Sequence, residues 1–171
     1  DAASKLNMLP SKASLLPHAL TKGVLRALFK PVNLVGGRSI GLCCMQSARD
    51  FRTAGTGYTV IANGSTIDLA KPSSGFSNSG LLVSVNYTMV VGTVFSLELQ
   101  WNVAIEEIGG VDLVVRKGAL TNFSDLVEII HTVDASSPLT TSQGEGIGFT
   151  TPAFSSPVEF RVDQTTLFRI V

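Results

Sequence analysis

Apolar and polar residues alternate along two stretches in the middle of the chain, residues 83–89 and 95–103. A period of two places all the apolar side chains of a stretch on one face of a β-strand. The Gly92-Thr93 dipeptide between the two stretches has the composition of a tight primed turn, so we predict one long hairpin over Leu81–Ala104. An apolar face of this length has to be covered by a second apolar layer, which predicts a sandwich or a barrel.

The second of these stretches is predicted to be one-sided. Its apolar set includes Leu99 and Trp101, and its polar set includes Glu98 and Gln100. We therefore expect Trp101 to be buried in the core, where its truncation is costly. Glu98 and Gln100 are expected on the opposite face, where truncation has little effect.

Shorter apolar runs between turn residues predict further strands. The dipeptide Asn63-Gly64 is the clearest two-residue turn signal and predicts a hairpin between Tyr58–Ala62 and Ser65–Leu69. Residues 121–133 fit either a helical turn or a strand at their C-terminal end. Further strands are expected over residues 39–47, 111–117, 148–151, 158–162 and 166–171. Frequent turns between short strands predict an all-β, antiparallel jelly-roll sandwich.

Residues 14–30 instead have the spacing of an amphipathic helix. Apolar residues recur every four positions at Leu16, Leu20, Val24 and Leu28, and basic residues recur with the same spacing at His18, Lys22, Arg26 and Lys30. These two series lie on opposite sides of a helix. Ser14 suits the N-cap, and Pro31 would end the helix. We therefore expect an N-terminal arm with a basic helix over residues 1–36 and a jelly-roll domain over residues 37–171.

Charge is sparse and unevenly distributed. Charged residues make up 15% of the chain and apolar residues 44%. This charge density is low for a soluble monomer and fits a subunit that is surrounded by neighbours. Residues 1–52 carry eight basic and two acidic side chains, a net charge of +6, whereas residues 53–171 carry five and eleven, a net charge of −6. The basic end predicts an anionic partner.

The residue types that carry catalysis are not grouped in the sequence. His131 lies in an apolar run and is expected to be structural, and no Gly-x-Ser-x-Gly elbow is present. The adjacent Cys43 and Cys44 fit two small apolar residues of a strand, because a disulfide between neighbours is strained. Glu106-Glu107 is expected at a solvated turn. We predict that the chain is not an enzyme and has no catalytic residue.

Cofactor, metal and membrane sites are also not expected. The glycine-rich run from Gly144 to Gly148 lacks the helix that follows a phosphate-binding loop. The sequence does not cluster metal-ligating side chains, so we predict neither a cofactor nor a metal. Apolar residues do not form an uninterrupted run of about 18, so no membrane span is expected.

These features together resemble the jelly-roll coat proteins of picornavirus-like icosahedral viruses, including the small coat proteins of the plant secovirid group. The stretch Leu81–Ala104, with Gly92-Thr93 at its tip and Trp101-Asn102 near its end, is similar to central paired strands of such subunits. Asp1 resembles the first residue of a product cut from a polyprotein. The resemblance implies a capsid subunit of the virion, assembled in the host cytoplasm with itself or sister coat proteins, with weak, non-specific contact to genomic RNA. It also implies that Lys22, Arg26 and Lys30 face this RNA or a neighbouring subunit.

A secreted or cell-surface β-sandwich binding module, lectin-like or cytokine-like, is the alternative interpretation. The chain has three Asn-x-Ser/Thr sequons, at Asn63, Asn86 and Asn122, which we expect to be unmodified. Glycans at Asn63 or Asn122 would favour the binding module. The mass in solution also separates the two interpretations, because a shell reaches megadaltons and a single chain has a mass of 18.0 kDa.

Overall fold

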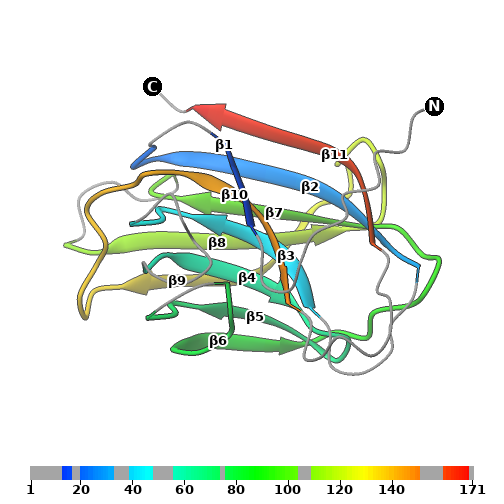
Figure 1. The fold of residues 1–171 in the computed structure, drawn as a ribbon, viewed down its shortest axis with the longest axis horizontal. Coiled ribbons are helices and arrows are strands. Elements are labelled where there is room, and N and C mark those ends of the chain that lie inside the picture. The colour runs from blue at the N-terminus through cyan, green and yellow to red at the C-terminus, as the bar shows by residue number, and fades with distance from the viewer. Residues whose placement is uncertain are drawn as a thin grey trace.

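Two antiparallel β-sheets packed face to face form the body of the protein (Figure 1). The computed structural model describes residues 13–16, 20–32, 39–47, 56–73, 76–103, 109–150 and 160–169. The strands in these segments are β1 (Ala13–Leu16), β2 (Gly23–Pro31), β3 (Ser39–Cys44), β4 (Tyr58–Ala62), β5 (Thr66–Ala70), β6 (Leu81–Asn86), β7 (Phe95–Trp101), β8 (Val111–Gly118), β9 (Val127–Asp134), β10 (Glu145–Thr150) and β11 (Phe160–Arg169). The all-β sandwich predicted from the alternating pattern is confirmed.

The order of the strands shows that the chain crosses repeatedly between the two layers. The six-stranded sheet has the order β1-β10-β3-β4-β5-β6, and the five-stranded sheet has the order β11-β2-β7-β8-β9. Strands β6 and β9 form edges of the two sheets on the same side of the sandwich (Figure 1). The described residues contain no helix that is long and apolar enough to cross a membrane.

One main apolar core fills the space between the sheets. Alternate residues of the central strands supply it, among them Leu25 and Phe29 of β2, Val60 of β4 and Leu97 of β7. Trp101 is the largest fully buried side chain, and its indole Nε1 donates a hydrogen bond to the Leu20 carbonyl at 3.0 Å. Trp101 therefore lies in the core, as the alternating pattern predicted.

The predicted long hairpin is wrong, although both of its strands exist. Strand β6 pairs with β5 in the six-stranded sheet, whereas β7 pairs with β2 and β8 in the other sheet. The Gly92 turn is present, with φ of +81°, and the Thr93 N–H donates to the Val90 carbonyl at 3.2 Å. Positive φ falls on the second central residue, which is typical of a type II turn and does not match the twist of a hairpin.

The predicted helix over residues 14–30 is also wrong where the chain is described. Residues 13–16 form β1, and residues 23–31 form β2 between β11 and β7. A spacing of four residues fits a strand as well as a helix, because an even number of residues returns to the same face of a strand. Strand β2 is a central strand of the five-stranded sheet. The division between an arm over residues 1–36 and a domain over 37–171 stays a prediction, and residues 1–12, 17–19 and 33–36 of that arm lie outside the described residues.

Neither face of β7 is exposed, which contradicts the one-sided prediction. All seven of its residues are buried, including Glu98 and Gln100 on the face that points away from the core. The Glu98 carboxylate is covered by Arg26 of β2 and Arg116 of β8. A central strand has neighbours on both sides, so its outer polar residues are buried beneath the long side chains of those neighbours.

The connection between β5 and β6 packs over the outer face of the six-stranded sheet. Phe76 is buried there in a small apolar cluster with Cys43 and Ile61. The Phe76 ring also fills the space above Gly148, where an added Cβ would lie 2.4 Å from it. Next to this cluster, the buried Asp68 accepts hydrogen bonds from the side chains of Asn63, Asn78 and Ser84 at 2.9, 3.1 and 2.6 Å. The strand face around these residues is therefore occupied by the chain itself.

Candidate functional site

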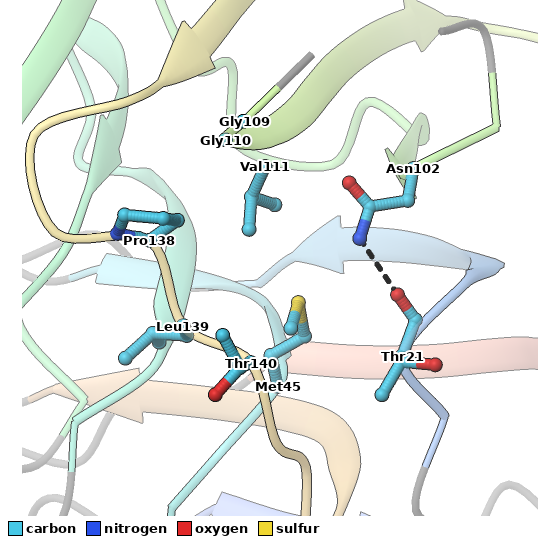
Figure 2. Close-up of a pocket in the computed structure, with 9 residues that line it drawn as sticks. All are labelled: Thr21, Met45, Asn102, Gly109, Gly110, Val111, Pro138, Leu139 and Thr140. Atoms are coloured by element: carbon cyan, nitrogen blue, oxygen red, sulfur yellow. Dashed lines mark hydrogen bonds between the residues drawn. The ribbon is translucent and has the colours of Figure 1, made fainter. Parts of the chain in front are cut away.

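A pocket of about 460 Å³ opens at the end of the sandwich where several strands begin or end (Figure 2). Strand β2 begins here and β3 and β7 end here, and the connection between β9 and β10 passes across this end. The described residues that line the pocket are Thr21, Met45, Asn102, Gly109, Gly110, Val111, Pro138, Leu139 and Thr140. Val111 is the first residue of β8, and the other lining residues come from segments that flank strands. The pocket therefore lies among connections held by a rigid scaffold.

The pocket combines polar groups with apolar walls and carries no ionisable side chain among the described residues that line it. Thr21 and Thr140 contribute hydroxyl groups at exposed positions, and Asn102 contributes an amide. Val111, Leu139 and the buried Met45 supply apolar surface. Its volume is within the usual range of ligand pockets, which also combine apolar walls with a few placed polar groups.

Asn102 connects three elements at the pocket wall. Its side-chain Nδ2 donates to the Thr21 carbonyl at 2.8 Å, and its Oδ1 accepts from the Asp112 backbone N–H at 3.0 Å (Figure 2). Its own backbone N–H donates to the Asp112 carbonyl at 2.8 Å. These bonds join the start of β2, the end of β7 and the start of β8, so the amide is held in one orientation.

Backbone strain is concentrated at this end of the molecule. Three non-glycine residues in the described segments have positive φ, and two of them, Met45 at 51° and Asn102 at 54°, line the pocket. Asparagine tolerates this region, whereas methionine is uncommon there. Strained residues of this kind persist where the surrounding structure fixes them and often occur at binding sites.

A buried polar network fixes the wall formed by residues 136–140. Asp134 accepts hydrogen bonds from the Tyr58 hydroxyl at 2.8 Å and from Lys71 Nζ at 2.6 Å. Lys71 Nζ also donates to the Ser137 carbonyl, and the Leu139 N–H donates to the Tyr58 hydroxyl at 3.3 Å. Burial alone would raise the pKa of Asp134, but the hydrogen bonds from Lys71 and Tyr58 and the Lys71 charge outweigh burial and lower this pKa. The ionised carboxylate therefore organises the pocket wall.

The basic residues singled out in the sequence are not at the pocket. Lys22 lies just before β2, and Arg26 and Lys30 lie on β2. Leu25, Ala27 and Phe29 point into the core, so Arg26 and Lys30 alternate with them and belong to the outer face of the five-stranded sheet. The stripe of Lys22, Arg26 and Lys30 was predicted on a helix, whereas Arg26 and Lys30 lie on a strand. Their contact with RNA or a neighbouring subunit stays a prediction.

The remaining chemically notable residues have structural surroundings. His131 Nε2 lies 2.8 Å from Asp112 Oδ1, and His131 Nδ1 lies 3.7 Å from Glu128 Oε1. Burial raises the pKa values of the Cys43 and Cys44 thiols, which keeps both in the unreactive thiol form. Within the described segments, we find no group of three or more His, Cys, Asp or Glu side chains that could hold a metal ion.

Sequence reasoning missed every residue of the pocket. The described lining residues come from five separate places in the chain and share no motif or spacing. One available signal was Asn102 directly after a strand, because asparagine often adopts positive φ at strand ends. The Gly109-Gly110 pair, which directly precedes β8, was a second such signal.

Comparison with known proteins supports the fold and goes no further. No family model matches the chain, and no curated protein matches it in sequence. Sheep galectin-11 in complex with glycerol is similar with a TM-score of 0.51 and 7% identity, over 95% of this chain and 100% of that chain. The carbohydrate-binding module CBM66 from Bacillus subtilis is similar with a TM-score of 0.58 and 14% identity, over 90% and 78%.

A third solved structure is the exoplasmic/lumenal domain of VIP36 in its Ca²⁺- and Man3GlcNAc-bound form. Its TM-score is 0.60 and its identity 12%, over 95% of this chain and 77% of that chain. At such low identities these likenesses show that the chain shares a β-sandwich fold with galectins and carbohydrate-binding domains. A shared fold does not by itself carry function, which has to be argued from the site.

Proposed function

We propose that this chain is a carbohydrate-binding β-sandwich module and that the end pocket is its binding site. The observation that carries the proposal is the lining of the pocket, in which hydroxyl and amide groups stand beside apolar walls without an ionisable side chain among the described residues. A sugar ring has the matching chemistry, with hydroxyl groups at its rim and C–H groups on its faces. The CBM66 and VIP36 likenesses support the same class of ligand.

The pocket residues have distinct roles in this proposal. Thr21 and Thr140 offer hydroxyl groups that donate to or accept from sugar hydroxyls. Leu139 packs against the apolar face of the ring, and the buried Val111 and Met45 lie behind it as apolar surface. We further propose that the sandwich is of the jelly-roll class and that the module binds without catalysis, because the described pocket lining has no side chain able to act as a general acid or base.

A glycan array tests this proposal, followed by calorimetric titration of the neutral oligosaccharides that bind. Thr140→Trp should block the pocket and abolish binding, because the indole fills the space that the ring needs. Thr140→Val should weaken binding about 5- to 30-fold through the loss of one hydroxyl hydrogen bond.

Thr88→Val is the matched control, since Thr88 is also an exposed threonine in an irregular segment but lies in the β6–β7 connection. It should leave glycan affinity unchanged. Binding of glycans that survives Thr140→Trp would place the site elsewhere, and a folded protein that binds no glycan on the array would contradict the proposal.

The capsid subunit suggested by the sequence is a second proposal. It is supported by the sandwich architecture and by the low charge content of 15%. The solved structures described above are galectins and carbohydrate-binding domains, and they favour the binding module. The two proposals predict different masses in solution.

A further inference from the structure

A row of alternating charges crosses the outer face of the five-stranded sheet. The strand registers place Arg26 opposite Glu98, Glu98 opposite Arg116, and Arg116 opposite Glu128. Thr166 of β11 completes the row next to Arg26. Opposite charges in direct cross-strand register attract each other, so the row is stable as a unit.

Glu98 at the centre of this row has both carboxylate oxygens occupied. Its side chain is fully buried; Arg26 Nε donates to Oε2, and Arg116 Nη1 donates to Oε1 at 3.0 Å. Gln100 Nε2 also donates to Oε1, at 2.6 Å. One buried acid therefore fixes two guanidinium groups through a single N–H bond each. A guanidinium has five N–H donors in a rigid fork.

The two guanidinium groups still reach solvent. The Arg26 side chain is 31% exposed and the Arg116 side chain 34% exposed. The Arg26 Cζ lies 5.0 Å from the ring centroid of Phe168 and 5.8 Å from that of Phe123. Phe168 is itself 40% exposed. The fixed Arg26 guanidinium thus lies beside an exposed aromatic ring at the β11 end of the row.

We propose that Arg26, Arg116 and Phe168 form a second binding site, for a carboxylate group carried by a sugar ring. Arg26, Arg116 and the Glu98 between them carry a net charge of +1, and Glu128 opposite Arg116 brings the whole row to zero. The positive charge that a ligand meets is therefore at the Arg26 end of the row, beside Phe168, and one carboxylate balances it. A phosphate monoester carries about −1.5 to −2 and would exceed this charge. Glu128, the other acid in the row, faces His131 at 3.7 Å and lies on the far side of Arg116. The sugar as carrier of the carboxylate rests on the proposed function, whereas the carboxylate itself follows from the arginine pair.

Calorimetric titration with alginate tetrasaccharide, which carries uronate carboxylates, and with neutral cellotetraose tests this site. Arg26→Lys keeps the charge beside Glu98 but removes the planar fork, so it should lower the affinity for alginate tetrasaccharide at least tenfold. Arg116→Lys should do the same. Circular dichroism and thermal melting confirm that each variant is folded.

Lys30→Gln is the matched control, because it removes a positive charge from the same face of β2 without touching the row. It should change the affinity for alginate tetrasaccharide less than twofold. If Lys30→Gln and Arg26→Lys weakened the binding of alginate tetrasaccharide equally, the proposal would be overturned in favour of a diffuse basic surface. Tight binding of single-stranded RNA that Lys30→Gln weakens as much as Arg26→Lys does would overturn it in the same way.

The two binding proposals fail separately in this experiment. Alginate tetrasaccharide that binds with Arg26 dependence, in a protein that binds no neutral glycan, would leave the carboxylate site standing and remove the pocket proposal. Neutral glycan binding in a protein that does not bind alginate tetrasaccharide would remove the carboxylate site alone.

Discussion

At the scale of single residues, the consequences of burial depend on what each side chain contacts. Trp101 is fully buried in the core, and its truncation should destabilise the fold by about 3–5 kcal/mol. Glu98 is equally buried but on the opposite face of the same strand, where its partners are two arginines. Its importance could not be predicted from alternation, because alternation gives the face of a residue and not what covers that face.

Glu98→Ala should lower the free energy of unfolding by about 1–3 kcal/mol. This is less than the loss for a fully buried ion pair, because both arginines are about one-third exposed and can be solvated. Urea denaturation at neutral pH measures the change. Glu128→Ala is the control from the same row, with a side chain 47% exposed, and it should change stability by less than about 0.5 kcal/mol. Equal effects of the two substitutions would show that the Glu98 bonds contribute little.

Asp134 should make stability depend on acid pH. Its pKa is lowered in the folded protein, where hydrogen bonds from Lys71 and Tyr58 and the Lys71 charge outweigh the opposing effect of burial. The ionised carboxylate therefore stabilises the fold above its unfolded pKa of about 3.9, and this contribution is lost as the pH falls through the lower folded value.

Urea denaturation between pH 7 and pH 2 measures this dependence. Asp134→Asn should be less stable than the natural chain at pH 7, and the two stabilities should converge as the pH falls. If the difference in the free energy of unfolding between the two proteins stayed constant from pH 7 to pH 2, Asp134 would not contribute to acid sensitivity.

At the scale of elements, close contacts between connections and strands hold the layers in place. The β4–β5 turn forms close to the place that the Asn63-Gly64 dipeptide predicted. The Asn63 N–H donates to the Thr66 carbonyl at 3.1 Å, so the turn is centred on Gly64-Ser65, one residue later than predicted. Gly64 has φ of +97°, which fits the first central residue of a type II′ turn.

The contact between Phe76 and Gly148 should couple the β5–β6 connection to β10. Gly148→Ala should destabilise the fold by about 1–3 kcal/mol, because the new methyl group would lie 2.4 Å from the Phe76 ring. Combining it with Phe76→Ala should reduce the penalty of Gly148→Ala, giving a coupling of at least about 0.5 kcal/mol in a double-mutant cycle by urea denaturation.

Gly23→Ala provides the control for this cycle. Its added Cβ would lie 2.6 Å from the Trp101 ring. Gly23 and Trp101 both belong to the five-stranded sheet, whereas Gly148 belongs to the six-stranded sheet. The effect of Gly23→Ala should therefore add to that of Phe76→Ala without coupling. If the effects of Phe76→Ala and Gly148→Ala on stability were also additive, the Phe76 ring would be free to move away from the new methyl group.

At the scale of the whole molecule, the order of the strands brings together a charge from the basic part of the sequence and a charge from the acidic part. Strand β2, from the basic N-terminal part, lies between β11 and β7, and Arg26 pairs directly with Glu98 from the acidic part. This pair joins two residues that lie 72 positions apart in the chain within one sheet.

The mass in solution should distinguish the two proposed functions. We expect size-exclusion chromatography with light scattering to give a species close to the chain mass of 18.0 kDa, because the carbohydrate-binding module needs no shell partners. The measurement is made over a range of protein concentrations and at low and moderate salt, with sister coat proteins absent. Particles of megadalton mass would contradict the module and support the capsid subunit.

The sequence by itself determined which residues form most of the strands and which side chains of β7 face the core. These properties depend on a period of two, which is local. The tertiary structure decided whether residues 23–31 are a helix or a strand, since a spacing of four satisfies both and only pairing with β7 and β11 selects the strand. It also decided that β6 and β7 enter different sheets. The pocket and the Arg26–Glu98–Arg116 row likewise join residues from separate elements, whose proximity depends on sheet order rather than on any local pattern.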